Sequence, residues 1–224
     1  MRKGLTEVVF ILDRSGSMSG LESDTIGGFN SMLKKQRSES GEAYISTVLF
    51  NTWSKVLYDR VPVSQVKNMT RRQYNVGGGT ALLDAIGGAI RHISIVHTYS
   101  RDEDIPEKTI FIIITDGMEN SSQDYSYDQV KSAIEEKKNF YGWEFLFLGA
   151  NIDAVEVAGR FGINANRAVN YECDGIGTRL NYEVLSKAVS AVRNSQSEQE
   201  CDEMICECCE IINKDYNARH FRRY

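Results

Sequence analysis

Short apolar runs and helical apolar stripes follow one another along the 224-residue chain. Continuous runs of strand length that are rich in β-branched residues predict buried strands. Apolar positions three and four residues apart predict helices with one buried face. The predicted strands span residues 6–12, 43–50, 54–61, 109–115, 144–149 and 168–172. The predicted helices span residues 22–37, 81–98, 127–139, 153–161, 178–193 and 200–217.

This order of elements predicts an α/β fold with three layers. Strands that are apolar throughout need cover on both faces, so we expect a doubly wound, Rossmann-like, mostly parallel central sheet of about six strands with helices on both faces. The short segment "NTW" between 43–50 and 54–61 predicts a hairpin and one antiparallel edge strand. Residues 1–193 are predicted to form one binding domain. The polar segment 194–200 then leads into a C-terminal helical extension, residues 194–224.

Composition narrows the setting. A content of 42% hydrophobic and 25% charged residues is typical of a globular protein. The net charge of −5 argues against nucleic acid as a partner, because phosphate backbones bind basic surfaces. No window reaches the ~20 apolar residues of a membrane span. The five cysteines are odd in number and fit a reducing compartment, so we expect a cytoplasmic protein without membrane contact.

Polar segments stand at the exits of the first and of the most apolar predicted strand, and before one helix. They are "DRSGS" (13–17), "GGGT" (77–80) and "TDG" (115–117). Ligands of open α/β sheets bind beyond the carboxyl ends of the strands, so these segments form the candidate site. They offer oxygen ligands and no nitrogen or sulfur side-chain ligand, which suits Mg²⁺ or Mn²⁺ better than zinc.

Taken together, the D-x-S-x-S segment, a distant Thr after a glycine run and an Asp-Gly pair that closes a strand resemble the metal-ion-dependent adhesion site of von Willebrand factor A domains. The resemblance covers about residues 5–193. It implies hydroxyl ligands from Ser15, Ser17 and Thr80, with Asp13 and Asp116 coordinating directly or through water. It also implies a bound Mg²⁺ (or Mn²⁺) whose sixth position accepts an acidic side chain of a partner.

The function implied by this resemblance is a divalent-cation-dependent protein-binding module, not an enzyme. The chain resembles stand-alone bacterial or phage-type members, and family analogy points to an ATPase complex as the partner. The family's C-terminal helix, which can shift on ligand binding, would correspond to residues 178–193. Residues on the same rim are candidates for the partner surface: Gly79, Glu119, Asn120 and Asn151.

Ordinary structural roles compete with this interpretation. Asp13 or Ser15 could cap the helix near residue 22, although the gap is long for a cap. Thr80 is a plausible N-cap for helix 81–98 whether or not it also binds a metal. Asp116 with Gly117 is, by itself, an ordinary strand-to-turn pair.

Other chemistries are weaker. The glycine run lacks the Lys-Ser/Thr pair of a phosphate-binding loop. A phosphoryl-accepting Asp13 would lack a second acid two residues later, where Ser15 stands. A serine nucleophile would need a base from His92, His97 or His220, and none is predicted near the site. A Mg²⁺-dependent phosphate-handling enzyme and a scaffold with a vestigial site stay open as alternatives.

The segment "CDEMICECC" suggests a zinc or redox site at first sight. On a helix it instead predicts a buried apolar stripe, with Cys206 and Cys209 off its centre: Cys201, Met204, Ile205, Cys208 and Ile212. One continuous helix cannot direct four of these thiols at one metal. Farther back in the chain, Asp153 is predicted to cap the short helix that follows it.

Overall fold

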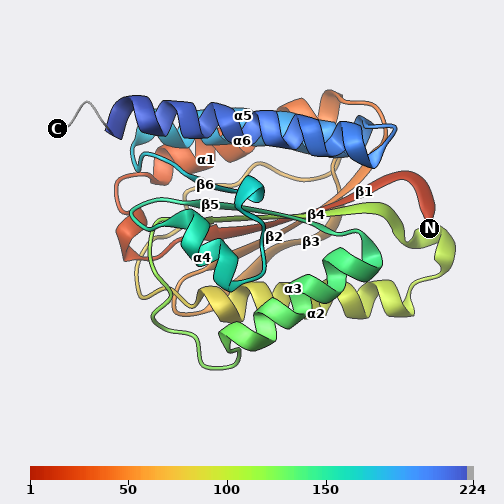
Figure 1. The fold of residues 1–224 in the computed structure, drawn as a ribbon, viewed down its shortest axis with the longest axis horizontal. Coiled ribbons are helices and arrows are strands. Elements are labelled where there is room, and N and C mark those ends of the chain that lie inside the picture. The colour runs from red at the N-terminus through yellow and green to blue at the C-terminus, as the bar shows by residue number, and fades with distance from the viewer. Residues whose placement is uncertain (221–224) are drawn as a thin grey trace.

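A six-stranded sheet runs through the centre of the computed structural model, which describes residues 1–220 (Figure 1). Residues 221–224, the end of the predicted C-terminal extension, lie outside the described residues. The strand order is β3-β2-β1-β4-β5-β6, and only β3 runs antiparallel to its neighbour. The strands are β1 (Arg2–Asp13), β2 (Glu42–Phe50), β3 (Ser54–Pro62), β4 (Pro106–Thr115), β5 (Glu144–Gly149) and β6 (Ala168–Asn170).

Helices cover both faces of the sheet, which confirms the predicted three-layer fold. One layer holds α1 (Glu22–Ser38), α5 (Gly175–Asn194) and α6 (Glu198–His220). The opposite layer holds α2 (Leu82–Tyr99), α3 (Tyr127–Tyr141) and α4 (Ala154–Arg160). Among residues 1–220, no helix is long and apolar enough to cross a membrane.

Each central strand feeds two separate hydrophobic cores. In β1, Val8, Phe10 and Leu12 pack under α1 and α5, while Val9 and Ile11 pack toward α2. Successive side chains of a strand point to opposite faces, so an uninterrupted apolar run fills both cores. This burial fixes β1 and β4 side by side, and their carboxyl ends therefore emerge together.

Two element boundaries differ from the prediction for local reasons. β1 begins at Arg2 rather than residue 6, with a register shift between Arg2 and Thr6 where Gly4 adopts a φ of +73°. α5 begins at Gly175 rather than residue 178, because the Asp174 carboxylate accepts hydrogen bonds from the backbone of Ile176 and Gly177.

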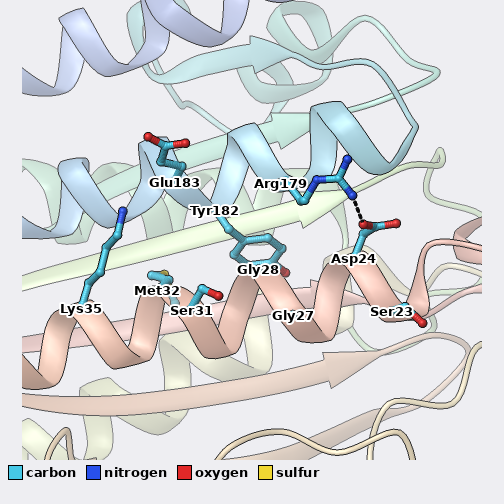
Figure 2. A pocket seen from close by; sticks show the side chains of 10 residues that line it. All are labelled: Ser23, Asp24, Gly27, Gly28, Ser31, Met32, Lys35, Arg179, Tyr182 and Glu183. Carbon is cyan, nitrogen blue, oxygen red and sulfur yellow. Dashed lines mark hydrogen bonds and ion pairs between the residues drawn. The ribbon is translucent and has the colours of Figure 1, made fainter.

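Helices α1 and α5 touch closely at one point and leave a groove around it (Figure 2). A Cβ added to Gly28 would lie 2.4 Å from Tyr182 Cδ2, so only glycine lets the Tyr182 ring lie on α1. The groove has a volume of about 450 Å³, and an ion pair between Arg179 and Asp24 (2.6 Å) crosses it. None of the five predicted metal ligands lines this groove.

Helix α6 packs its cysteine-rich face into the same core as α5. Its buried residues are Cys201, Ile205, Cys208, Cys209 and Ile212. The predicted stripe was therefore wrong at two positions: Met204 is 41% exposed, and Cys209 is buried in its place. An ion pair between Arg219 and Asp174 joins the end of α6 to the start of α5. The domain boundary at residues 193/194 stays a prediction.

Candidate metal centre

The three predicted segments meet at the carboxyl ends of β1 and β4. Leu12 pairs with Ile114 across the two strands, so Asp13 and Asp116 leave the sheet next to each other. The Ser17 hydroxyl donates to Asp116 Oδ1 (2.5 Å), and the Ser15 and Ser17 hydroxyl oxygens are 3.0 Å apart. Four of the five predicted ligands thus belong to one cluster.

Thr80 joins this cluster through the glycine loop. The backbone of Gly16 donates to Gly78 O (3.1 Å), which ties the loop to the exit of β1. A Cβ placed on Gly117 would lie 3.4 Å from Ser17 Oγ and 3.5 Å from Thr80 Oγ1. The two hydroxyls therefore flank the residue that follows Asp116, and all five predicted side chains gather at one place.

The two carboxylates of this cluster are buried without a cation. Asp13 and Asp116 are each 1% exposed, and neither forms an ion pair with a lysine, arginine or histidine among residues 1–220. Burial raises the pKa of Asp13, partly offset by hydrogen bonds from Thr115 and Ser15. Burial also raises the pKa of Asp116, and the nearby negative charge of Asp13 raises it further. The hydrogen bond from Ser17 lowers this pKa and offsets part of the increase.

This donor set fits a hard divalent cation. Two carboxylates and three hydroxyls are oxygen ligands of the kind that Mg²⁺ and Mn²⁺ prefer. No cluster of three or more His, Cys, Asp or Glu side chains suited to a metal occurs in the described part of the chain. A centre at this place would depend on the hydroxyls as well as the carboxylates.

Several supporting residues were not predicted from the sequence. Thr115 Oγ1 donates to Asp13 Oδ2 (2.6 Å), and the Ser15 backbone donates to Asp13 Oδ1 (2.6 Å). The Tyr74 hydroxyl donates to the Asp13 carbonyl oxygen (2.5 Å). These bonds fix both carboxylate oxygens and the strand exit, which is the orienting role that outer residues have at metal sites.

Cys173 is a further neighbour that the sequence did not reveal. Its thiol donates to Asp116 Oδ2 (3.7 Å). Burial, with the negative charge of Asp116, raises the pKa of this thiol to about 11, so it stays protonated at neutral pH. It therefore orients the carboxylate as a weak donor.

The N-terminus of α2 is capped by other residues than Thr80. α2 begins at Leu82 without a side-chain cap from Thr80, which corrects that prediction. Glu119 Oε2 accepts from the Leu83 backbone (2.9 Å) and Ser122 Oγ from that of Asp84 (3.1 Å). This long-range cap leaves the Thr80 hydroxyl available for a metal.

The helix after the first segment is not capped by a predicted metal ligand either. α1 begins at Glu22 with Leu21 at its N-cap position and no side-chain cap, so neither Asp13 nor Ser15 caps it. The capping prediction for Asp153 is confirmed, because its Oδ1 accepts from the Glu156 backbone (2.9 Å) at the start of α4.

Glycine is required in the loop before Thr80 for two physical reasons. Gly77 and Gly78 have φ values of +146° and +81°, a region that side chains disfavour. A Cβ on Gly79 would lie 2.1 Å from Ser121 Oγ and 2.8 Å from Asn120 Oδ1, so any larger residue would displace these side chains of the β4–α3 loop.

The partner-surface candidates differ in what their polar atoms already do. Glu119 accepts four hydrogen bonds in the cap of α2 and its own loop, and Gly79 donates to Thr52 Oγ1 (2.8 Å). Asn120 is exposed, and its Oδ1 accepts from the Thr80 backbone (2.9 Å). Asn151 is exposed at a φ of +56°, with its Nδ2 3.4 Å from Asp116 O. Asn120 and Asn151 therefore remain the more accessible candidates.

The three histidines interact elsewhere. His92 contacts Asp59 (2.8 Å), His97 lies 3.4 Å from Glu7, and His220 lies 3.3 Å from Glu172. None of these distances involves a predicted metal ligand.

The structure of the chain is similar to solved structures, although its sequence has no close match. No protein-family model and no curated protein sequence matches the chain. A "von Willebrand factor type A" protein from Catenulispora acidiphila aligns with a TM-score of 0.51 and 16% identity, over 81% of this chain and 41% of that one. The vWF domain of the type V pili tip protein Mfa5 from Porphyromonas gingivalis aligns with a TM-score of 0.58 and 11% identity, over 87% and 98% of the two chains.

The chain has a von Willebrand factor A-like fold. A third similar structure is proximal thread matrix protein 1 from the mussel byssus "with zinc occupied MIDAS motif", at a TM-score of 0.58 and 13% identity. This alignment covers 81% of the present chain and 47% of that protein. The chain thus spans less than half of the Catenulispora and mussel proteins that it matches.

Proposed function

We propose that the chain is a divalent-cation-dependent protein-binding module. The observation that supports it best is the pair of buried carboxylates, Asp13 and Asp116, that no cationic side chain of the described chain neutralises. An unpaired buried charge is costly in a folded protein. A cation from solution would remove that cost.

The residues that would hold the cation are those that converge in the structure. We propose Mg²⁺ or Mn²⁺ with Asp13, Ser15, Ser17, Thr80 and Asp116 as its protein ligands, because all five offer oxygen. When bound, the ion would supply a Lewis-acidic centre that accepts a carboxylate oxygen from an Asp or Glu of a partner protein. The mussel protein with a zinc-occupied MIDAS motif supports the presence of a metal in this fold.

We propose a binding role for the cluster and no catalysed reaction. No histidine of residues 1–220 hydrogen-bonds to the candidate ligands, and we assign the two carboxylates of the cluster to cation binding rather than to proton transfer. By analogy with stand-alone members of the family, we propose a bacterial or phage-type cytoplasmic protein whose partner belongs to an ATPase complex.

Titration calorimetry with Mg²⁺ and Mn²⁺ tests the metal. We expect one ion per chain, and at least tenfold weaker binding in Thr80→Val and Asp116→Asn. Ser19→Ala and Asp128→Asn are the matched controls, because these exposed residues lie near the same loops and should bind as the wild type does. The absence of binding, or equal binding by all four variants, would contradict the metal site.

A second experiment tests the acidic partner. A random dodecapeptide library displayed on phage is bound in Mg²⁺ and eluted with EDTA. We expect the eluted peptides to share an Asp or Glu whose change to Asn or Gln abolishes binding. If Mg²⁺ binds but no peptide depends on it, or peptides without acids are eluted, the module does not recognise carboxylates.

A further inference from the structure

We propose that Arg14 and Trp53 form a second contact point beside the candidate metal centre, and that the partner segment offers it a second carboxylate next to an apolar or aromatic side chain. This inference rests on the proposed function, since it describes the partner of the same site.

Arg14 is a cation that forms no ion pair with any residue between 1 and 220. Its Nη1 lies 3.4 Å from Asn75 O and its Nη2 lies 3.4 Å from Asn51 Oδ1, both at the long limit of a hydrogen bond. Its Nε is buried and has no partner among residues 1–220. A guanidinium normally makes short, charge-assisted bonds to carboxylates, so this one has unused donor capacity.

Other arginines that approach the ends of α1 and α5 do not share this property. Arg179 pairs with Asp24 at 2.6 Å, and Arg219 pairs with both Asp174 and Asp215. Their charges are already balanced within the molecule. Arg14 therefore differs from them as an available anion-binding group.

Trp53 is an exposed aromatic residue of the β2–β3 loop. The residue is 73% exposed, although large aromatic residues are usually well buried. Its backbone N–H donates to Asn51 Oδ1 (3.0 Å), the same oxygen that Arg14 Nη2 approaches. One asparagine oxygen thus links the backbone of Trp53 to the Arg14 guanidinium, and Trp, Tyr and Arg are the residues most enriched at binding hot spots.

Both residues are joined to the candidate metal centre. Arg14 follows Asp13 directly, and its carbonyl oxygen accepts from the Gly77 backbone (2.9 Å). On the Trp53 side, Asn51 Nδ2 donates to Gly77 O (2.6 Å), and Thr52 Oγ1 accepts from the backbone of Gly79. These contacts hold the β2–β3 loop against the loop that ends in Thr80. A single partner segment on the metal can therefore reach this contact point.

The chemistry of the contact point defines the partner. Arg14 favours a second carboxylate, and Trp53 favours an apolar or aromatic neighbour. Nucleic acid would offer phosphates and stacking bases, but the net charge of −5 disfavours it. A protein segment with two acids and a bulky apolar residue fits best.

Peptides eluted by EDTA from the phage library serve as probes for this inference. We expect them to carry two acidic residues and an apolar or aromatic residue. Arg14→Gln and Trp53→Ala should each weaken peptide binding about tenfold or more, which is typical of hot-spot residues. Arg72→Gln and Tyr99→Ala are matched controls at exposed positions and should bind as the wild type does.

Mg²⁺ binding separates the two proposals. It should not weaken in Arg14→Gln or Trp53→Ala, since neither side chain is a proposed ligand and loss of the Arg14 charge removes a repulsion between two cations. Peptides that depend on Mg²⁺ but bind both variants normally would overturn the second contact point and leave the metal-dependent module intact. If the wild-type protein does not bind Mg²⁺, the proposed cation-dependent binding function is wrong. A single-stranded oligonucleotide that binds in Mg²⁺ and is lost in Arg14→Gln would show that the partner class is wrong.

Discussion

Strand β1 contains two buried acids with opposite surroundings. Glu7, in the middle of the strand, is fully buried and forms an ion pair with Arg60 (2.7 Å), with His97 at 3.4 Å. Asp13, at the end of the same strand, has only hydroxyl and backbone donors and the second acid Asp116 nearby. The protein supplies the counter-charge for Glu7. For Asp13 and Asp116 we propose that the solution supplies it.

The difference separates an acid that stabilises the fold from acids kept for binding. A buried carboxylate with a fixed cation is stable by itself and has no remaining need for a ligand. A pair of uncompensated carboxylates costs stability in the free protein and recovers it on binding a cation. Changes at the two places should therefore move stability in opposite directions.

The largest effect is expected at the paired acid. Arg60→Met leaves Glu7 buried without its main partner and should lower the free energy of unfolding by about 3–5 kcal/mol. Urea denaturation measures this loss. The exposed Arg91→Met on α2 is the control and should change little. Adding Glu7→Gln to Arg60→Met should recover part of the loss; a double variant no more stable than the single one would argue against the ion pair as the cause.

The next largest change in stability should come from adding Mg²⁺, which we expect to bind at the unpaired acids Asp13 and Asp116. At a concentration one hundred times its dissociation constant, an ion that binds only the folded state raises the free energy of unfolding by about 2.7 kcal/mol. Thermal and urea denaturation with Mg²⁺ and with EDTA measure the gain. Thr80→Val, which should bind at least tenfold more weakly, should lose about half of this gain or more, and an equal gain in that variant would place the ion elsewhere.

Removal of one unpaired charge should have a smaller effect of the opposite sign to that of Arg60→Met. In EDTA, Asp116→Asn should raise the free energy of unfolding by about 1–2 kcal/mol, because a buried charge without a counter-charge is removed. The amide oxygen can still accept the Ser17 hydrogen bond. A clear loss of stability in EDTA would mean that the Asp116 carboxylate is already compensated within the protein.

The pH dependence should be the smallest effect. The pKa values of Asp13 and Asp116 are raised in the folded protein, so the folded state holds their protons more tightly than the unfolded state does. In EDTA the protein should therefore become more stable as the pH falls and these two carboxylates take up protons. The gain is lost as the pH rises above their raised pKa values. Mg²⁺ competes with the same protons, so its stabilisation should shrink in acid.

Comparison of the wild type with Asp116→Asn between pH 7 and 4 isolates this contribution from that of other groups. The stability difference between the two proteins in EDTA should narrow as the pH falls. A difference that stays constant across this range would mean that Asp116 keeps its charge when the pH is lowered.

The sequence predicted the fold where the signal is local, and it predicted which polar segments would stand together at the ends of the strands. The run "TIFIIIT" and the strand "EFLFLG" are apolar throughout, and residues 109–115 and 144–149 indeed lie in β4 and β5, which are inner strands of the sheet. The polar segments stand where such strands end, so their convergence follows from parallel topology. Local patterning and topology were sufficient for these features.

Contacts between distant segments could not be predicted in this way. Glu119 caps α2 from 36 residues away, and Tyr74 reaches the Asp13 carbonyl across 61 residues. Cys173 comes to Asp116 from a loop with no recognisable motif. The Met204 error has a similar origin, since helical spacing alone does not say which edge of a cysteine-rich stripe faces α5.

The most direct test of the central claim is a crystal structure of the protein grown with Mn²⁺, with diffraction data collected at the manganese absorption edge. The account predicts one strong anomalous peak per chain, within bonding distance of Ser15, Ser17 and Thr80 and beside Asp13 and Asp116. A fully ordered site with no peak, or a peak only at other residues, would contradict the claim that the two buried carboxylates are kept for a divalent cation.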